Sequence, residues 1–410
     1  VITGVTGLLH NPMVGVYNGS AATFNFGQDS SFAGNKATSN ANADGNGHGS
    51  FAYAPPSGFL ALCSQNLPDV KIIDGMEHFN TVLYTGDAST SRAISGVGFS
   101  PDWLWIKNRS NTYSHMIYDV VRGAGKYISS DNTGAEATGS HMNSFDSDGF
   151  TVSYASSNRT NQNNENYAAW NWKAGTAFSN DASATSVGTI DSTGQVNTKA
   201  GFSIVSYTGN GTNGATFKHG LSSKPQLAII KNRDASTNWI VYTEKLGATK
   251  NLVLEETGAA VTSATRFNNT EPTSTVFSLG TTTAVNGSGT DYIAYCFHSV
   301  EGYSKVGSYT GNGSTDGTFV HTGFRPAWIM LKESGNARNW VISYDYSTYY
   351  NGVTQSLFPN ITQAEDANVR LDFLSNGFKL RTTSTSWNNS GGNFIYLAFA
   401  ENPFKYSNAR

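Results

Sequence analysis

The strongest constraint on the fold is an internal repeat of roughly 100 residues. Three passages open with Tyr84–Gly86, Tyr207–Gly211 and Tyr309–Gly313. Each continues with a proline and an apolar strand ending in lysine: Pro101–Lys107, Pro225–Lys231 and Pro326–Lys332. A second apolar strand (115–119, 239–242, 340–345) and a closing one (167–170, 292–297, 396–399) follow. The prolines lie 124 and then 101 residues apart, and the closing tyrosines 125 and then 104 apart, so the sequence predicts three homologous units.

Units of this size can bury a core of their own. Their apolar runs are four to seven residues long and rich in β-branched and aromatic residues. Asn-Gly and Asp-Gly pairs, which suit tight turns, separate them. We therefore predict an all-β chain of tandem antiparallel β-sandwich modules of the jelly-roll or concanavalin-like kind. Short helices are expected only at 244–254 and 363–369.

The expected domain boundaries follow from the repeats. Residues 71–176, 200–299 and 300–410 are the three repeats, and 177–199, rich in Ser, Thr and Asp, is predicted to be a flexible linker. Repeats two and three should therefore dock more rigidly on each other than on repeat one. Residues 1–70, with an alternating run at Phe24–Gln28, are interpreted as the C-terminal part of a β domain whose beginning is missing.

Composition narrows the function classes. The 410 residues carry 26 basic and 29 acidic side chains, a formal net charge of −3, and 13% charged residues against about 25% in globular proteins. No basic block marks a nucleic-acid binder, and no apolar run approaches the ~18 residues of a membrane span. Two buried thiols at Cys63 and Cys296 are favoured over one disulfide, because each lies in an apolar context.

The sequence contains no nucleophile elbow, no zinc-binding helix motif and no phosphate-binding loop. The eight histidines include no pair at metal-ligand spacing. His219 and His321 follow matching Thr-Phe strands, which favours a structural hydrogen bond over ligand contact. We therefore expect no enzyme, no cofactor and no metal.

Carboxylates are the next candidates for catalysis, because glycan-cleaving acids act in pairs. Asp146–Gly149 resembles the start of a calcium loop, but the matching Leu374–Phe378 segment favours a hairpin turn in both repeats. Glu255, Glu256, Glu271 and Glu365 lie in polar loops without a partner that spacing can identify. The alternative that the fold brings two of these carboxylates together as a catalytic pair stays open.

Aromatic residues give the candidate binding residues. The pairs Trp103 and Trp105, and Trp170 and Trp172, alternate within strands, which favours the core over a sugar-binding platform. Loops at the ends of sandwiches carry function more often. The candidates there are Tyr154, Arg159, Tyr346, Tyr349, Tyr350 and Trp387, with Asn161 and Asn163 nearby. The alternative interpretation makes each an ordinary surface residue.

The repeated segments resemble a module of tailed-bacteriophage virion proteins. The resemblance rests on Phe99–Arg109, Tyr118–Gly123, Ser144–Phe150, Tyr167–Trp170, Gly307–Gly317, Gly323–Trp328 and Ala398–Phe404. The opening segment, with Phe24–Gln28 and Pro56–Leu62, resembles the end of a concanavalin-like (SPRY-like) sandwich found upstream of such modules. Together these matches cover essentially the whole chain.

The resemblance implies a virion structural protein on a tail fibre or appendage, exposed at the particle surface. Its implied partners are other virion proteins and a host cell-surface glycan, and its implied assembly is a homotrimer. Adhesion is the first hypothesis, a structural capsid decoration or spacer is the second, and a polysaccharide depolymerase is the third. No catalytic residues are carried over from the family.

Overall fold

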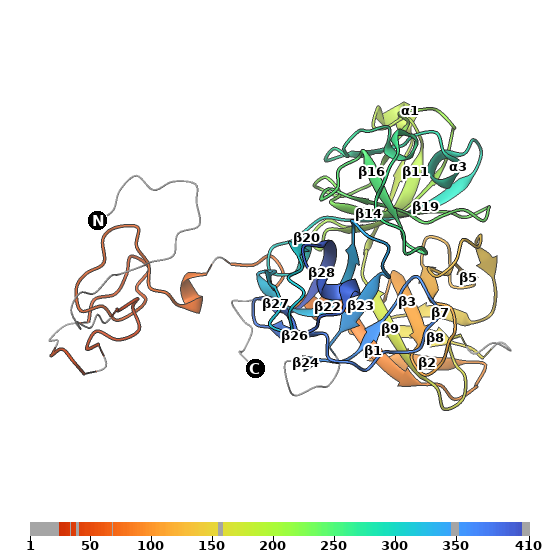
Figure 1. Cartoon of the computed structure of the whole chain (residues 1–410). Helices are drawn as coiled ribbons and strands as arrows, with labels where there is room; N and C mark the ends of the chain where they lie inside the picture. Colours follow the sequence, from red (N-terminus) through yellow and green to blue (C-terminus); the bar gives the residue numbers. More distant parts are fainter. Residues whose placement is uncertain are drawn as a thin grey trace. The chain divides into compact units, whose positions relative to one another are not determined.

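The structure is a computed structural model, and it describes residues 24–32, 34–37, 41–67, 69–154, 159–345 and 352–403 (Figure 1). The chain divides into two units, Val1–Asp69 and Val70–Arg410. Antiparallel sheets dominate the second unit, so the fold is all-β and of the sandwich type. In the described part of the chain, no helix has the length and hydrophobicity needed to cross a membrane.

The first unit contains little regular structure in its described residues. Its elements are a 3-10 turn, η1 (Ser64–Asn66), and a single bridge between Asn42 and Phe51. The strand predicted at Phe24–Gln28 is wrong, because Gly27 adopts a φ of 97° and turns the chain. The carboxylate of Asp44 instead organises the segment by accepting hydrogen bonds from the N–H groups of Asn46, His48 and Ala61.

The second unit contains three modules, which we define as residues 70–175, 176–299 and 300–403. Module 1 contains a 3-10 turn, η2 (Gly75–Glu77). Its main sheet has the order β1 (Phe79–Thr85), β9 (Asn166–Trp172), β3 (Trp103–Asn108), β4 (Met116–Asp119). Its smaller sheets are β2 (Arg92–Ser95), β8 (Gly149–Val152), β7 (Met142–Asp146), and the pair β5 (Lys126–Tyr127), β6 (Ala137–Thr138).

Module 2 has the longest sheet. Its order is β10 (Thr176–Asn180), β11 (Ser192–Asn197), β12 (Phe202–Thr208), β19 (Asp291–Phe297), β14 (Leu227–Asn232), β15 (Ile240–Thr243), β16 (Lys250–Val253), β17 (Val261–Thr262). The second sheet pairs β13 (Thr216–Lys218) with β18 (Val276–Ser278). One-turn helices are α1 (Ala182–Thr185), α2 (Ala264–Phe267) and α3 (Thr283–Asn286).

Module 3 repeats the pattern. Its main sheet is β20 (Ser304–Thr310), β28 (Asn393–Pro403), β22 (Phe324–Glu333), β23 (Val341–Tyr344), β25 (Ser356–Leu357). Its second sheet is β21 (Phe319–His321), β27 (Gly377–Leu380), β26 (Leu371–Leu374), β24 (Gly352–Val353), and α4 spans Thr385–Asn388. The four repeated strands therefore have the same order in all three main sheets: the opening strand, the closing strand, the lysine-ending strand and the strand that follows it in the sequence.

Strand register corrects one sequence alignment. The opening tyrosines Tyr84 and Tyr207 pair with Tyr167 and Tyr292, but Tyr309 pairs with Phe394. Tyr396 therefore lies two residues beyond the position we expected for it. It pairs with Gly307, where a Cβ atom would lie 2.3 Å from the Tyr396 ring, so the glycine makes room for a side chain that the other repeats lack.

Each module closes a hydrophobic interior of its own between its main and second sheets. In module 1 this interior contains Leu104 and Ile106, and in module 2 it contains Ala228 and Ile230. In module 3 the equivalent positions are Ile329 and Leu331. These residues alternate along the lysine-ending strands, so their neighbours on the same strands face the other way.

The opposite faces of the three main sheets pack on one another and form a shared core. Its aromatic members are Phe79, Trp103, Trp105, Trp170 and Trp172 from module 1, Phe202, Trp239, Tyr295 and Phe297 from module 2, and Tyr303, Trp328, Trp340, Tyr344 and Phe399 from module 3. All are buried. The two tryptophan pairs are thus core residues, as favoured from sequence, but the core belongs to all three modules.

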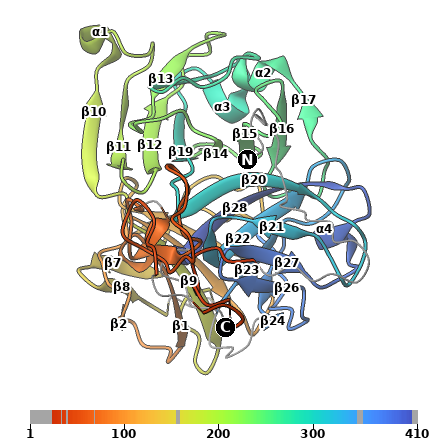
Figure 2. The same cartoon turned by 90° about the vertical axis from the view of Figure 1, so that its left-hand side faces the viewer.

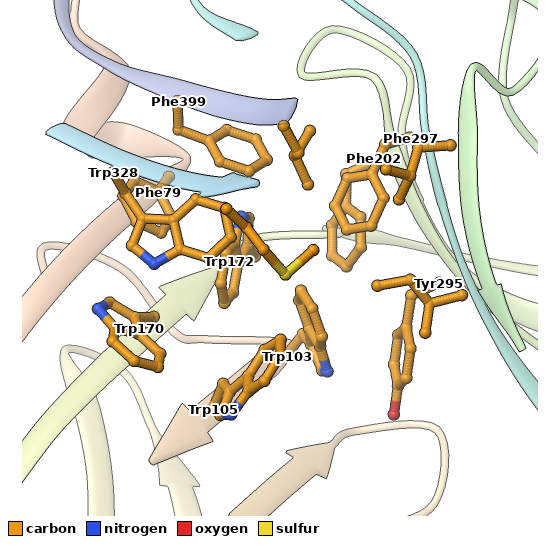
Figure 3. Packing of buried hydrophobic residues seen from close by; sticks show 14 of the residues in the cluster. Phe79, Trp103, Trp105, Trp170, Trp172, Phe202, Tyr295, Phe297, Trp328 and Phe399 are labelled. Carbon is orange, nitrogen blue, oxygen red and sulfur yellow. The ribbon is translucent and has the colours of Figure 1, made fainter. Parts of the chain in front are cut away.

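Ring contacts join every pair of modules (Figure 3). Trp103 stacks on Tyr295 with centroids 4.6 Å apart, and Phe79 stacks on Phe399 at 5.0 Å. Phe297 meets Phe399 edge to face at 6.1 Å. Because Trp or Phe truncation in a core costs about 3–5 kcal/mol, this cluster contributes a large share of the stability of the whole unit.

The three lysines that end the repeated strands close this arrangement into a ring. Each is fully buried and donates from Nζ to backbone carbonyls of its own loop and to one carbonyl of another module. Lys107 reaches Thr362 O at 3.1 Å, Lys231 reaches Thr133 O at 2.9 Å and Lys332 reaches Thr257 O at 3.2 Å. Module 1 thus donates to module 3, module 2 to module 1, and module 3 to module 2.

A second set of equivalent side chains repeats the same direction around the ring. The indole N–H of Trp239 donates to Ser129 O at 3.0 Å, and that of Trp340 donates to Val253 O at 2.8 Å. In module 1, His115 Nε2 lies 2.9 Å from Phe358 O. A head-to-tail interface repeated three times closes without a free end, which explains why all three modules form one compact unit.

The flexible linker predicted at residues 177–199 is wrong. Strands β10 and β11 form an antiparallel hairpin, and β11 pairs with β12 along the edge of the module 2 sheet (Figure 2). Phe178, Ile190 and Val196 pack on the interior of module 2. The hairpin lies between the first two repeats, which accounts for the longer first spacing. The less rigid attachment expected for module 1 stays a prediction.

Local predictions had mixed outcomes. Asp146 and Gly149 bracket a hairpin turn between β7 and β8, and Leu374 and Gly377 bracket the equivalent turn between β26 and β27, as favoured. The helices expected at 244–254 and 363–369 are wrong. The first span instead ends in β16, which pairs with β15.

Replacing Lys332 by Met should destabilise the three-module unit by roughly 2 kcal/mol. Met keeps the length of the side chain, but the carbonyls of Thr257, Glu333 and Asn336 lose a charged donor inside the protein. Urea unfolding measures the change, with the exposed Lys199→Met as control. A Lys332→Met protein as stable as the wild type would show that burial of the ammonium offsets its hydrogen bonds.

Candidate functional site

Two of the sequence-predicted binding residues lie at one end of module 1 and are partly buried. The Tyr154 N–H donates to Ser89 O at 2.9 Å. The Arg159 guanidinium lies over the Tyr127 ring, 5.6 Å from its centroid, and its Nη1 lies 3.9 Å from Met116 Sδ. Arg159 thus covers the module 1 interior, and a role for either residue in binding stays a prediction.

The prediction that Trp387 is an accessible loop residue is wrong. It lies in α4 with 1% of its surface exposed and belongs to the interior of module 3. Its carbonyl accepts a hydrogen bond from the Tyr309 hydroxyl at 2.6 Å. Trp387 is flanked by polar residues in the sequence, so no apolar pattern indicated that it is buried. Tyr346, Tyr349 and Tyr350 lie outside the described residues.

The repeated Tyr-Thr-Gly loops are held by a buried asparagine in each module. Asn161, Asn286 and Asn388 are fully buried, and each accepts a hydrogen bond at Oδ1 from the backbone of its loop, at 3.1, 2.9 and 2.8 Å. Asn161, considered from sequence as a loop contact, is therefore a structural residue. The loops are fixed parts of the modules.

The matching histidines have different environments. His219 is buried, with Nδ1 accepting from the Leu221 N–H at 3.2 Å and Nε2 lying 3.2 Å from Thr273 O. Burial lowers its pKa to about 4, so it is neutral at pH 7. The structural role favoured from sequence is confirmed for His219, whereas His321 is exposed. Cys63 and Cys296 are free thiols, as favoured, although Cys63 is only half-buried.

Glu255 has the most perturbed carboxyl group among the acids considered from sequence. Burial raises its pKa to about 7, with a further increase from Glu256. Its Oε2 accepts the Trp239 N–H at 3.0 Å. Asp131 and Asn360 accept the equivalent N–H groups of the other repeats, so this carboxyl is a structural acceptor within the repeat pattern.

The remaining candidate acids are also held by neighbouring groups. The Glu365 carboxylate accepts hydrogen bonds from Arg109 Nε at 3.0 Å and from Arg109 Nη2 at 2.6 Å. This ion pair joins modules 3 and 1. Glu271 accepts from the Tyr242 hydroxyl and from the Ala248 N–H. Among the described residues, no three His, Cys, Asp or Glu side chains gather in a way that could hold a metal ion.

A groove between modules 2 and 3 is the best candidate for a binding site in the second unit. It comprises two cavities, of about 330 and 480 Å³, that share Lys245 and Ser308. The remaining lining residues are Lys305, Val306, Gly307, Tyr309, Phe319, Val320, His321 and Tyr396 in the smaller cavity, and Leu246, Lys250, Ala259, Ala260, Ser334, Gly335, Asn393, Phe394 and Ile395 in the larger one. Figure 2 shows β20 along this boundary.

The groove, defined by these two linings, is positively charged. Lys245 and Lys250 are exposed, Lys305 is half-buried, and none of the lining residues is acidic. Burial lowers the pKa of Lys305, and repulsion from Lys245 lowers it further. The Lys305 ammonium donates to His321 O at 2.9 Å.

Sequence reasoning missed this groove entirely. Its lysines stand singly in the chain, and no aromatic loop motif marks them. A position-by-position comparison of the repeats could have identified one of these lysines. Lys305 pairs with Ala398, and the equivalent pairs are Ser203 with Cys296 and Asn80 with Asn171, so Lys305 stands where the other repeats have uncharged residues.

Comparison with known proteins places the chain in a family. Residues 74–403 match the family described as a domain of unknown function (DUF7483), so the chain belongs to this family. The matched region covers every strand of the three modules as one stretch. No curated protein matches the chain.

The raised pKa of Glu255 gives a pH prediction. The unfolded carboxyl releases its proton near 4.5 but the folded one near 7, so stability contributed by the protonated form is lost as pH rises between these values. Glu255→Gln keeps an acceptor for the Trp239 N–H and removes the loss. The free energy of unfolding of Glu255→Gln, relative to that of the wild type, should therefore increase from pH 4.5 to pH 8. The increase should exceed ~0.3–0.5 kcal/mol, which is the usual deviation from additivity between independent sites.

Urea unfolding at both pH values measures this difference, with the exposed Glu301→Gln as control. A constant difference for Glu255→Gln, or one that decreases with pH, would contradict the assignment of a raised pKa to this carboxyl.

Proposed function

We propose that this chain is a non-enzymatic structural component of a tailed-bacteriophage particle. It is carried on a tail fibre or similar appendage at the particle surface, where it adheres to a glycan on the host cell. The resemblance of its repeats to appendage modules supports this proposal, as does the closed ring of three modules. The proposed partners are other virion proteins and the host glycan, and the proposed assembly is a homotrimer.

The observation that carries the proposal is the shared core together with the groove at its side. A ring of modules joined by buried aromatic rings and lysines holds the groove walls in fixed positions. A preformed site loses little conformational entropy on binding, and repetition across an oligomer would raise avidity through effective concentration. A weak site per chain is then sufficient for adhesion.

A structural decoration or spacer role on the capsid is the second candidate. The closed ring favours it as well, because a rigid body can extend or cover a surface without binding a ligand. A depolymerase is less favoured, since cleavage requires two carboxyl groups flanking a bond, and none of the residues lining the groove is acidic.

Fluorescently labelled full-length chain should decorate host cells that adsorb the particle, and periodate oxidation of the cell-surface glycan should abolish the decoration. Gold-labelled antibody on intact particles should mark the tail. Cells that stay unlabelled, or labelling that resists periodate, would contradict adhesion to glycan. Gold spread over the capsid would favour the decoration role instead.

A further inference from the structure

The lysines of the groove are additions to the repeat rather than parts of it. The ring-forming lysine recurs in every module, at Lys107, Lys231 and Lys332, because it stabilises the same contact three times. Lys245 and Lys305 follow no such pattern. Lys245 lies two residues after Thr243, and the equivalent Asp119 in module 1 is followed at that spacing by Val121.

The edge of the module 3 sheet differs from its counterpart in module 2. In module 2, β11 covers the edge of β12, so that edge is already paired. In module 3, β20 is the terminal strand of the described main sheet, and the exposed Ser308 lines both cavities. Its backbone edge and hydroxyl therefore border the groove, where polar groups of a ligand could pair with them.

The charge of the groove is not balanced by its lining. Among the described residues, Lys245 forms an ion pair with one carboxylate, that of Glu244, at 2.9 Å. Glu244 also accepts from Gln226 at 2.8 Å and pairs with Lys224 at 3.5 Å. Lys305 is held beside Lys245 although burial and repulsion both disfavour its charged form. Keeping two ammonium groups together at a cost in free energy fits a site whose ligand supplies the negative charge.

The groove also offers apolar contact. Phe319 is 43% exposed and lines the smaller cavity, whose lining also includes the nearly buried Tyr309 and Tyr396. Sugar rings present C–H faces that pack on aromatic rings, while their carboxylates pair with ammonium groups. Both cavity volumes fall within the range of known ligand pockets.

We propose that this groove binds a carboxylate-bearing polysaccharide, with Lys245 and Lys305 pairing with its carboxylates and Phe319 packing on a sugar ring. This inference rests on the proposed adhesion function and specifies the class of glycan that is recognised. The ligand is an extended acidic chain, which lies across the modules 2 and 3 boundary beside β20.

Polygalacturonate is the probe, and its fully methyl-esterified form, which has the same backbone without the charges, is the control ligand. The full-length wild-type chain should bind polygalacturonate in a salt-sensitive manner and should not bind the ester. Lys245→Gln/Lys305→Gln should weaken binding by at least about tenfold, since two charged hydrogen bonds are lost. Lys199→Gln/Lys218→Gln, which removes the same charge from module 2 outside the groove, should bind as the wild type does.

Binding of the ester as tightly as the acid, or unchanged binding by the double variant, would overturn the proposal. The single variant Lys245→Gln, whose side chain is 33% exposed, provides a second test that does not disturb the packing, and it too should bind more weakly. Host-cell labelling separates the two hypotheses. If the double variant decorates cells as the wild type does, the groove assignment fails and adhesion stands. If the wild type binds polygalacturonate but no cell, adhesion fails and the groove stands.

Discussion

Packing of three main sheets around one aromatic core is the interaction on which the rest of the structure depends. Each main sheet is apolar on both faces, one for its own module and one for its neighbours. A single module would expose tryptophan and phenylalanine side chains to water at a high cost in free energy. Each module is therefore stabilised by packing on the other two. The family match, which spans all three modules, agrees with a unit of this size.

The charged side chains discussed above are of two kinds. The buried Lys332 and the partly buried Arg109–Glu365 pair each join two modules. The charges of the groove, in contrast, arise where the repeats differ from one another. The hairpin β10–β11 covers one sheet edge, and the absence of an equivalent beside β20 among the described strands leaves a boundary that a ligand can enter. The residues that the modules have in common thus form the scaffold. The residues in which the modules differ form the candidate site.

The sequence predicted the all-β class, the repeats and the burial of the tryptophan pairs, because these depend on local alternation. It did not predict the shared core, since alternation shows that a face is buried but not against what. The hairpin was missed because Phe178, Ile190 and Val196 are its few apolar anchors among polar residues. Trp387 was misjudged for the same reason. The groove was missed because Lys245 and Lys305 meet only through the packing of two modules.

Hydrogen exchange after one core substitution tests the shared core most directly. Phe399 contacts Phe79 of module 1 and Phe297 of module 2, so Phe399→Ala should weaken all three modules together. If the core is shared, amides of β3, β14 and β22 lose protection by the same free energy, about 3–5 kcal/mol. Loss of protection confined to β22, with β3 and β14 unchanged, would show that the modules are stable independently and would contradict the account.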